Sequence, residues 1–390
     1  MRFGLPLLAF LAGTAPLTLP ACSSSGSTSP TAPEGTADAA VNTTPADASA
    51  DAPLTDDAYV AAITSAMHDA LLADLVALVS AAKDLEAAAP YTSGQARGWD
   101  ATADAAAITS MKAAWVRARN AYEHVEGAFA PIFPDLDTAI DARYDDFLTE
   151  LLASGGDADP FDDQGVTGLH GVERILYAPE IPTRVVDFEK ALPGYVAARY
   201  PATEAEAAAF KQKLAHRVVV DATKLHDQWA PSKINIAIAF QGLISLMNEQ
   251  REKVTKAASN EEESRYAQRT MADVRLNLEG TTAIYAIFQP WIRSKANATD
   301  PSKDGPTIDT KILAGFDALK SAYAAVPGDA IPAPPATWSA ENPSDADRAT
   351  PFGQLYTKVR EAVDPTKDGG VVYEMNLAAS LLGFPQFAQK

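Results

Sequence analysis

The sequence has one cysteine and only five histidines among its 390 residues. A disulfide within the chain and a metal site built from several thiolates are therefore excluded. The chain has no Gly-x-Ser-x-Gly and no Walker-type phosphate loop, so a nucleophilic hydrolase or a P-loop enzyme has no support. It also lacks the His-Glu-x-x-His of zinc peptidases and any Glu-x-x-His, which a ferritin-like di-iron bundle needs twice. Any metal site must use isolated histidines and carboxylates.

Basic charge is also scarce. There are 32 Lys and Arg residues against 51 Asp and Glu residues, and the formal net charge is −19. This excess argues against nucleic acid or an anionic membrane face as a partner. The negative net charge is consistent with a protein that binds cations, although many soluble secreted proteins are acidic for solubility alone.

The N-terminus has the pattern of an export signal. A basic start and an apolar run from Phe3 to Leu19 precede Leu19-Pro20-Ala21-Cys22. We expect residues 1–22 to be a lipoprotein signal peptide whose lipobox cysteine, Cys22, carries the lipid. In the alternative, the protein is secreted in soluble form and Cys22 is a bystander at the cleavage site. Residues 23–54, rich in Ser, Thr, Ala and Pro, are predicted to form a disordered tether.

The rest, residues 55–388, is predicted to be an all-α domain: one up-and-down helical bundle or, more specifically, two packed bundles with a boundary near 199–232. Apolar residues recur at helical spacing and Pro or Gly separates the segments. No second apolar run of about 18 residues is expected to span a membrane, and 234–247 is read as a buried helix. The predicted helices are 55–90, 102–129, 135–152, a segment after Gly168 that ends before Pro179, 203–228, 232–257, 262–289, 308–325, 350–361 and 370–383.

The stretch Gly168-Leu-His170-Gly-Val-Glu173 is the first candidate site. Residues three apart share one face of a helix, so one cation could touch both His170 and Glu173. Gly168 and Gly171 would keep the surroundings of the imidazole open. A core histidine without a ligand role is the competing interpretation.

Acids on the preceding helices could complete the site. Glu123 and Glu126 are three apart, and Asp141 and Asp145 are four apart on what we read as one helix. Antiparallel helices joined by a short turn pack together, so Glu123 and Asp141 can approach the same space.

One imidazole with several carboxylates suits iron, manganese or zinc. A third set of candidate groups lies on one later predicted helix, where Asp273 and Asn277 are four apart and co-facial. The set comprises Glu261, Glu262, Glu263, Asp273, Asn277 and Glu279. It could complete the site or form a salt-bridged surface.

In this order, these residues resemble the imelysin family and are most similar to EfeO-type periplasmic iron-uptake proteins. The resemblance rests on Trp115 to Glu123, Phe133 to Asp137, Ile140 to Asp146, Gly168 to Glu173, and Glu262 to Tyr266 followed by Asn277 to Gly280. It covers about 56–385. Where the family often has Ser-His-Thr-Asp after Arg265-Tyr266, this chain has Ala-Gln-Arg-Thr, which lacks the His and Asp of a second metal position.

The resemblance implies an all-α fold, a location in the periplasm or at the cell surface, and iron as the bound ion, with zinc or another divalent cation as alternatives. It also implies partners in the envelope, including an iron permease. The expected metal ligands are His170, Glu173, Glu123, Asp141, Asp145 and Glu126. Arg143, Arg265 and Asp273 are expected to orient them.

Three functions follow as hypotheses. The first is an iron-binding protein of an uptake system. The second is an imelysin-type metallopeptidase, in which Glu173 or Glu123 would act as the base on a metal-activated water. The third is a binding module for an acidic or sugar polymer, with His170 as a core residue; the negative charge disfavours an anionic polymer.

Overall fold

The computed structural model describes residues 54–154, 157, and 159–386. By its internal contacts the chain divides into Met1–Ala52 and Pro53–Lys390, and every described helix belongs to the second unit. The predicted signal peptide, Cys22 and the tether up to residue 53 lie outside the described residues.

No strand occurs in the described part of the chain, which confirms the all-α prediction. The α-helices of the first half are α1 (Asp56–Ala88), α2 (Ala105–Phe129), α3 (Pro134–Asp141), α4 (Tyr144–Ser154), α5 (Gly168–Leu176), α6 (Thr183–Lys190), α7 (Glu204–Ala209) and α8 (His216–Trp229). The second half contributes α9 (Ile236–Lys256), α10 (Thr270–Arg293), α11 (Gly305–Ala324), α12 (Asp345–Arg348), α13 (Pro351–Ala362) and α14 (Val371–Leu381). A π-helical segment, Phe210–Ala215, joins α7 to α8.

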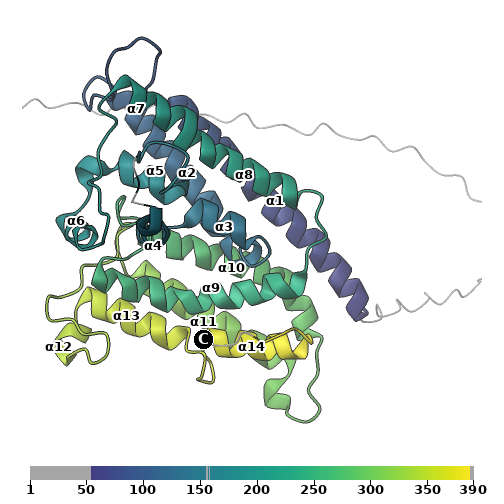
Figure 1. Cartoon of the computed structure of the whole chain (residues 1–390). Helices are drawn as coiled ribbons and strands as arrows, with labels where there is room; N and C mark the ends of the chain where they lie inside the picture. The colour runs from purple at the N-terminus through teal and green to yellow at the C-terminus, as the bar shows by residue number, and fades with distance from the viewer. Residues whose placement is uncertain (1–53, 155–156, 158, 387–390) are drawn as a thin grey trace, which may run out of the picture. The chain divides into compact units, whose positions relative to one another are not determined.

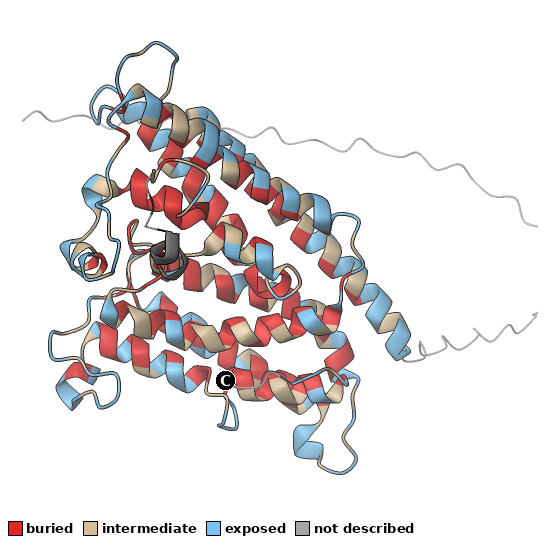
Figure 2. Ribbon diagram, viewed as in Figure 1, coloured by how far each residue is buried: buried red, intermediate tan, exposed pale blue. Residues whose placement is uncertain are grey.

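The helices form two groups that meet along α2. In the first group α1 packs against α2 and α8, and α3 and α5 lie beside them. In the second, α11 packs against α10, α13 and α14, and α9 contacts α10 and α14. Since α2 also contacts both α9 and α10, its buried face belongs to both groups. Buried residues concentrate where the helices face one another (Figure 2).

Helix α1 begins where the sequence predicts, because the side chain of Thr55 accepts a hydrogen bond from the backbone N–H of Ala58. Among the described helices, α1 is the one that is long and apolar enough, by length and composition, to cross a membrane. The prediction that the chain has no such apolar run after its N-terminal one is therefore wrong. The α1 leucines Leu71, Leu75 and Leu78 are buried against neighbouring helices. One face of α1 is therefore packed in the bundle, whereas only 28% of its most apolar window is buried.

Two predicted helix boundaries are wrong. The predicted helix 135–152 is broken, because Ala142 is extended (φ −58°, ψ 139°) and α4 starts only at Tyr144. The predicted helix 262–289 starts late, at Thr270, and residues 261–269 form an irregular turn. Both differences decide the geometry of the site. Helices α6 and α12 are absent from the prediction, because both are short.

Candidate metal centre

His170 lies in the first turn of α5, a helix buried along its whole length (Figure 2). Gly168 begins this helix with φ +74°, a conformation that glycine adopts readily. A β-carbon there would lie 2.6 Å from the carbonyl oxygen of Ile140 and 2.8 Å from that of Ala139. Gly168 therefore allows the start of α5 to press against the end of α3. The expectation that this glycine keeps the site open is wrong, since it permits a close backbone contact.

The close contact places the imidazole of His170 between two carboxylates. Its Nδ1 lies 2.6 Å from Glu173 Oε2, and its Nε2 lies 3.4 Å from Asp141 Oδ1. The 3.4 Å contact lacks hydrogen-bond geometry, so the buried Nε2 has no hydrogen-bond partner among the described residues. A buried polar atom of this kind is costly unless something binds it.

Both carboxylate oxygens of Glu173, on the other side of the ring, take part in hydrogen bonds. Its second oxygen, Oε1, accepts hydrogen bonds from the backbone N–H groups of Tyr266 (3.0 Å) and Ala267 (2.8 Å). The helical spacing predicted that one cation touches both His170 and Glu173. In the structure Glu173 instead faces Nδ1, which leaves Nε2 as the nitrogen open to a cation.

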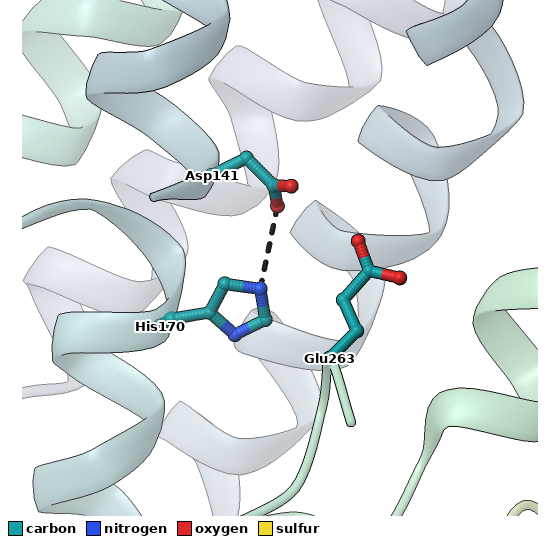
Figure 3. A group of neighbouring side chains, drawn as sticks. All are labelled: Asp141, His170 and Glu263. Atoms are coloured by element: carbon teal, nitrogen blue, oxygen red, sulfur yellow. Dashed lines mark ion pairs between the residues drawn. The ribbon is translucent and has the colours of Figure 1, made fainter. Parts of the chain in front are cut away.

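The irregular turn at 261–269 supplies the third group. Asp141, His170 and Glu263 each offer one atom within 4.8 Å of the others, and Figure 3 shows their side chains directed toward one another. One imidazole nitrogen and two carboxylate oxygens are suitable ligands for iron, manganese or zinc. The residues present therefore fit a metal ion.

Arg119 on α2 is the positive centre of this region, and its side chain is 0% exposed. Its guanidinium pairs with Asp141 and Glu123, lies 3.0 Å from Glu263, and lies 3.7 Å from Asp273. The buried guanidinium is therefore paired, although its single charge does not balance four carboxylates. Glu123, Glu263 and Asp273 form a second group with metal-ligand spacing, which shares Glu263 with the first.

Helix α10 reaches this region because Gly280 has no side chain. A β-carbon there would lie 1.8 Å from the carbonyl oxygen of His124 on α2. The close approach brings Asn277 to Glu123, whose side chain accepts a hydrogen bond of 2.7 Å from the amide. The same amide donates to Glu126 at 2.9 Å. Asn277 therefore fixes two acids of α2 from the other helical group.

The site opens into a cavity of about 410 Å³ between α2, α3 and α9. Asp141 and Glu263 form part of its lining, together with five further acids and three basic side chains. The further acids are Glu126, Asp137, Asp146, Glu249 and Glu252, and the bases are Arg143, Lys253 and Lys256. A cavity with this excess of negative charge attracts cations and lowers the local concentration of anions.

Burial and pairing shift the pKa values of the groups inside. Burial and Arg119 lower the pKa of His170, but the carboxylates of Asp141 and Glu173 outweigh them and raise it to about 9. Burial raises the pKa of Glu126 to about 8. For Asp141, burial acts to raise the pKa, yet Arg119 and His170 hold it below its ordinary value. Without a metal, the imidazole is thus the protonated partner of Asp141.

The structure distributes the remaining predicted residues differently. Asp145 pairs with Arg265 and belongs to neither group of candidate ligands. The prediction that Asp141 and Asp145 share one helix face is wrong, because the chain turns at Ala142 between α3 and α4. Arg143 lines the cavity and lies 3.4 Å from Asp146.

Sequence reasoning missed Arg119, and it left Glu263 open between the site and a salt-bridged surface. Arg119 has no role in the predicted site, although its position four residues before Glu123 was a signal for an ion pair. Glu263 stands in a run of three glutamates, a pattern that is also typical of a solvated helix surface. Only the irregular turn directs it inward.

Residues 65–363 match the family model of imelysin. The chain belongs to the imelysin family. Among curated proteins, an Efem/EfeO family lipoprotein of Staphylococcus aureus (strain MSSA476) is 27% identical over 188 residues, which are 48% of this chain and 52% of that protein. The same figures hold for the lipoprotein of strain MW2. The chain thus spans about half the length of the curated relatives it matches.

A solved structure has the same fold. The imelysin-like protein of Psychrobacter arcticum 273-4 superposes with a TM-score of 0.54 and 12% identity, over 86% of this chain and 98% of that one. A Parabacteroides distasonis ATCC 8503 protein, assigned as an iron-regulated protein A precursor, superposes with a TM-score of 0.50 and 14% identity over 85% and 97%. At this identity the likeness concerns the fold.

Proposed function

We propose that this imelysin-family protein binds a metal cation, iron in the first place, as cargo for uptake across the cell envelope. The observation that carries the proposal is the buried Nε2 of His170. It has no hydrogen-bond partner among the described residues, lies 3.4 Å from Asp141 Oδ1 (Figure 3), and is grouped with Asp141 and Glu263, which both line an acid-rich cavity. The similarity to Efem/EfeO family lipoproteins and the iron-regulated protein with the same fold support iron as the cargo.

The proposed ligands are His170 through Nε2, Asp141 and Glu263. Glu173 is not a ligand in this proposal but orients the imidazole. Its carboxylate accepts a hydrogen bond from Nδ1–H, which fixes the ring and favours the tautomer with a lone pair on Nε2. Arg119 holds the two carboxylates in place. The remaining predicted ligands, Glu123, Glu126 and Asp145, are paired with Arg119, Lys253 and Arg265 and would neutralise the surroundings of the ion.

No observation among the described residues favours the metallopeptidase. A general base needs a free oxygen near the metal-bound water. Glu173 uses both oxygens in hydrogen bonds, and Glu123 is paired with the guanidinium of Arg119. Cargo binding requires no such base.

Calorimetric titration with ferrous, ferric and zinc ions tests the proposal. We expect binding of one ion by the wild type and its loss in His170→Ala, Asp141→Asn and Glu263→Gln. His216→Ala is the matched control, because His216 is 52% exposed on α8 and pairs with Glu86 outside the site. Equal binding by His170→Ala and the control would refute the site.

The similarity to lipoproteins also supports export of this protein. The named relatives are lipoproteins, so we propose that residues 1–22 direct export and that Cys22 carries the lipid anchor. The acidic cavity would then face the periplasm or the cell surface, where a permease of the envelope is the expected partner. Metabolic labelling with a fatty-acid analogue, with Cys22→Ser as the control, checks the anchor.

A further inference from the structure

Glu263 differs from the other two proposed ligands because a second basic side chain, Lys253, contacts it besides Arg119. Lys253 Nζ, on α9, lies 2.8 Å from Glu263 Oε2 and 3.1 Å from Oε1. It also donates to Asn277 Oδ1 (2.9 Å) and Glu126 Oε2 (3.3 Å). An ammonium group thus occupies a carboxylate that a metal cation would need.

We propose that the ammonium group of Lys253 takes the place of the metal ion in the metal-free protein. It pairs with Glu263 there and is displaced when a cation binds. The inference rests on the proposed function and adds a means of release to it. Because the ammonium group belongs to the chain itself, it returns to Glu263 whenever the ion leaves.

Lys253 is able to move where Arg119 is not. The guanidinium of Arg119 is 0% exposed and is enclosed by four carboxylates. Lys253 is 10% exposed and lines the cavity, and its stem of four methylene groups lets the charge change position. Glu249, one helical turn earlier on α9, lines the same cavity and offers a new partner.

The exchange has two consequences for binding. An ammonium group that stayed on Glu263 would repel a divalent ion only a few ångströms away, so binding requires its displacement. Buried carboxylates left without a counter-charge destabilise a fold, so the ammonium group supports the metal-free protein. Both effects lower the affinity for the ion and raise its rate of release, as hand-over to a partner requires.

Replacement of Lys253 tests the inference, with Mn²⁺ and Zn²⁺ as the titrated ions. We expect Lys253→Met to bind each ion at least tenfold more tightly and to release it to a chelator at least tenfold more slowly. Lys253→Arg keeps the charge and should stay within about threefold of the wild type. Lys256→Met is the matched control, since Lys256 is one turn further on α9 and pairs with Glu252 at 2.8 Å.

A second variant separates folding from binding. Glu126→Gln with Lys253→Met removes the ammonium group together with one of the acids that it contacts. Tighter binding by this double variant supports the inference, as does folding of either variant only after Mn²⁺ is added. Affinity equal to or weaker than that of the wild type in both variants would overturn it, and so would a failure of Mn²⁺ to restore an unfolded variant.

The proposed function fails in a different way. If the wild type and Lys256→Met bind none of Mn²⁺, Zn²⁺, ferrous and ferric ions, no cargo site exists and the inference falls with it. If both bind and neither Lys253→Met nor the double variant binds more tightly than the wild type, the cargo site stands and only the role of Lys253 is refuted.

Discussion

Replacement of Glu173 by Gln separates two roles that the sequence could not distinguish, metal ligand and orienting group. The change keeps the size of a side chain that is 0% exposed. Gln can still accept from the two backbone N–H groups at 261–269 through its carbonyl oxygen. Its amide then faces His170 Nδ1 as a donor, where the carboxylate of Glu173 accepts.

The substitution therefore favours the wrong tautomer of His170. A donor opposite Nδ1 places the ring proton on Nε2, the nitrogen that should bind the ion. Loss of an orienting carboxylate behind a metal-bound histidine lowers metal affinity by about 10–100-fold. The hydrogen bond between Glu173 and the ring is buried and charged, and its replacement by a neutral hydrogen bond should lower the free energy of unfolding by about 1–3 kcal/mol.

Calorimetric titration with Zn²⁺ and urea unfolding measure the two effects on one variant. We expect weakened but measurable binding by Glu173→Gln, no binding by His170→Ala, and a lower unfolding midpoint for Glu173→Gln. Complete loss of binding with an unchanged midpoint would show that Glu173 is a direct ligand and refute the assignment. Unchanged affinity would refute the orienting role.

Three further predictions concern the stability of the fold. Gly168→Ala should cost about 1–3 kcal/mol of stability and weaken metal binding. The φ of +74° is unfavourable for alanine, and its β-carbon would lie 2.6 Å from the carbonyl oxygen of Ile140. Thermal unfolding measures the loss of stability, and metal titration measures the loss of affinity. Leu75→Ala on α1 should cost about 2–5 kcal/mol in urea unfolding while folded protein keeps its metal affinity, since Leu75 is fully buried away from the site. Arg199 lowers the pKa of Glu206 from 4.5 to about 2, so the pair stabilises the fold above about pH 4.5 and this contribution disappears as the pH falls toward 2. Because Arg199 is 46% exposed, Glu206→Gln should cost only about 1 kcal/mol in urea unfolding at pH 7 and less at pH 3; an equal cost at both would contradict the reasoning.

Much of the fold could be read from local patterns. The long helices α1, α2, α9 and α11 appear close to their predicted positions, because apolar spacing and capping residues act within a few turns. The irregular turn at 261–269 could not be predicted, since its residues also suit a helix. In the structure two of its backbone N–H groups donate to Glu173, a partner more than 90 residues away in the chain.

The sequence by itself identified the histidine of the candidate site. His170 is the one histidine followed by an acid at helical spacing. Which acids join it was decided only by the tertiary structure. The break at Ala142 separates Asp145 from Asp141, and the turn before α10 brings in Glu263. Arg119 and Lys253 then hold these carboxylates together, because buried negative charges from separate helices can share one space only around a counter-charge.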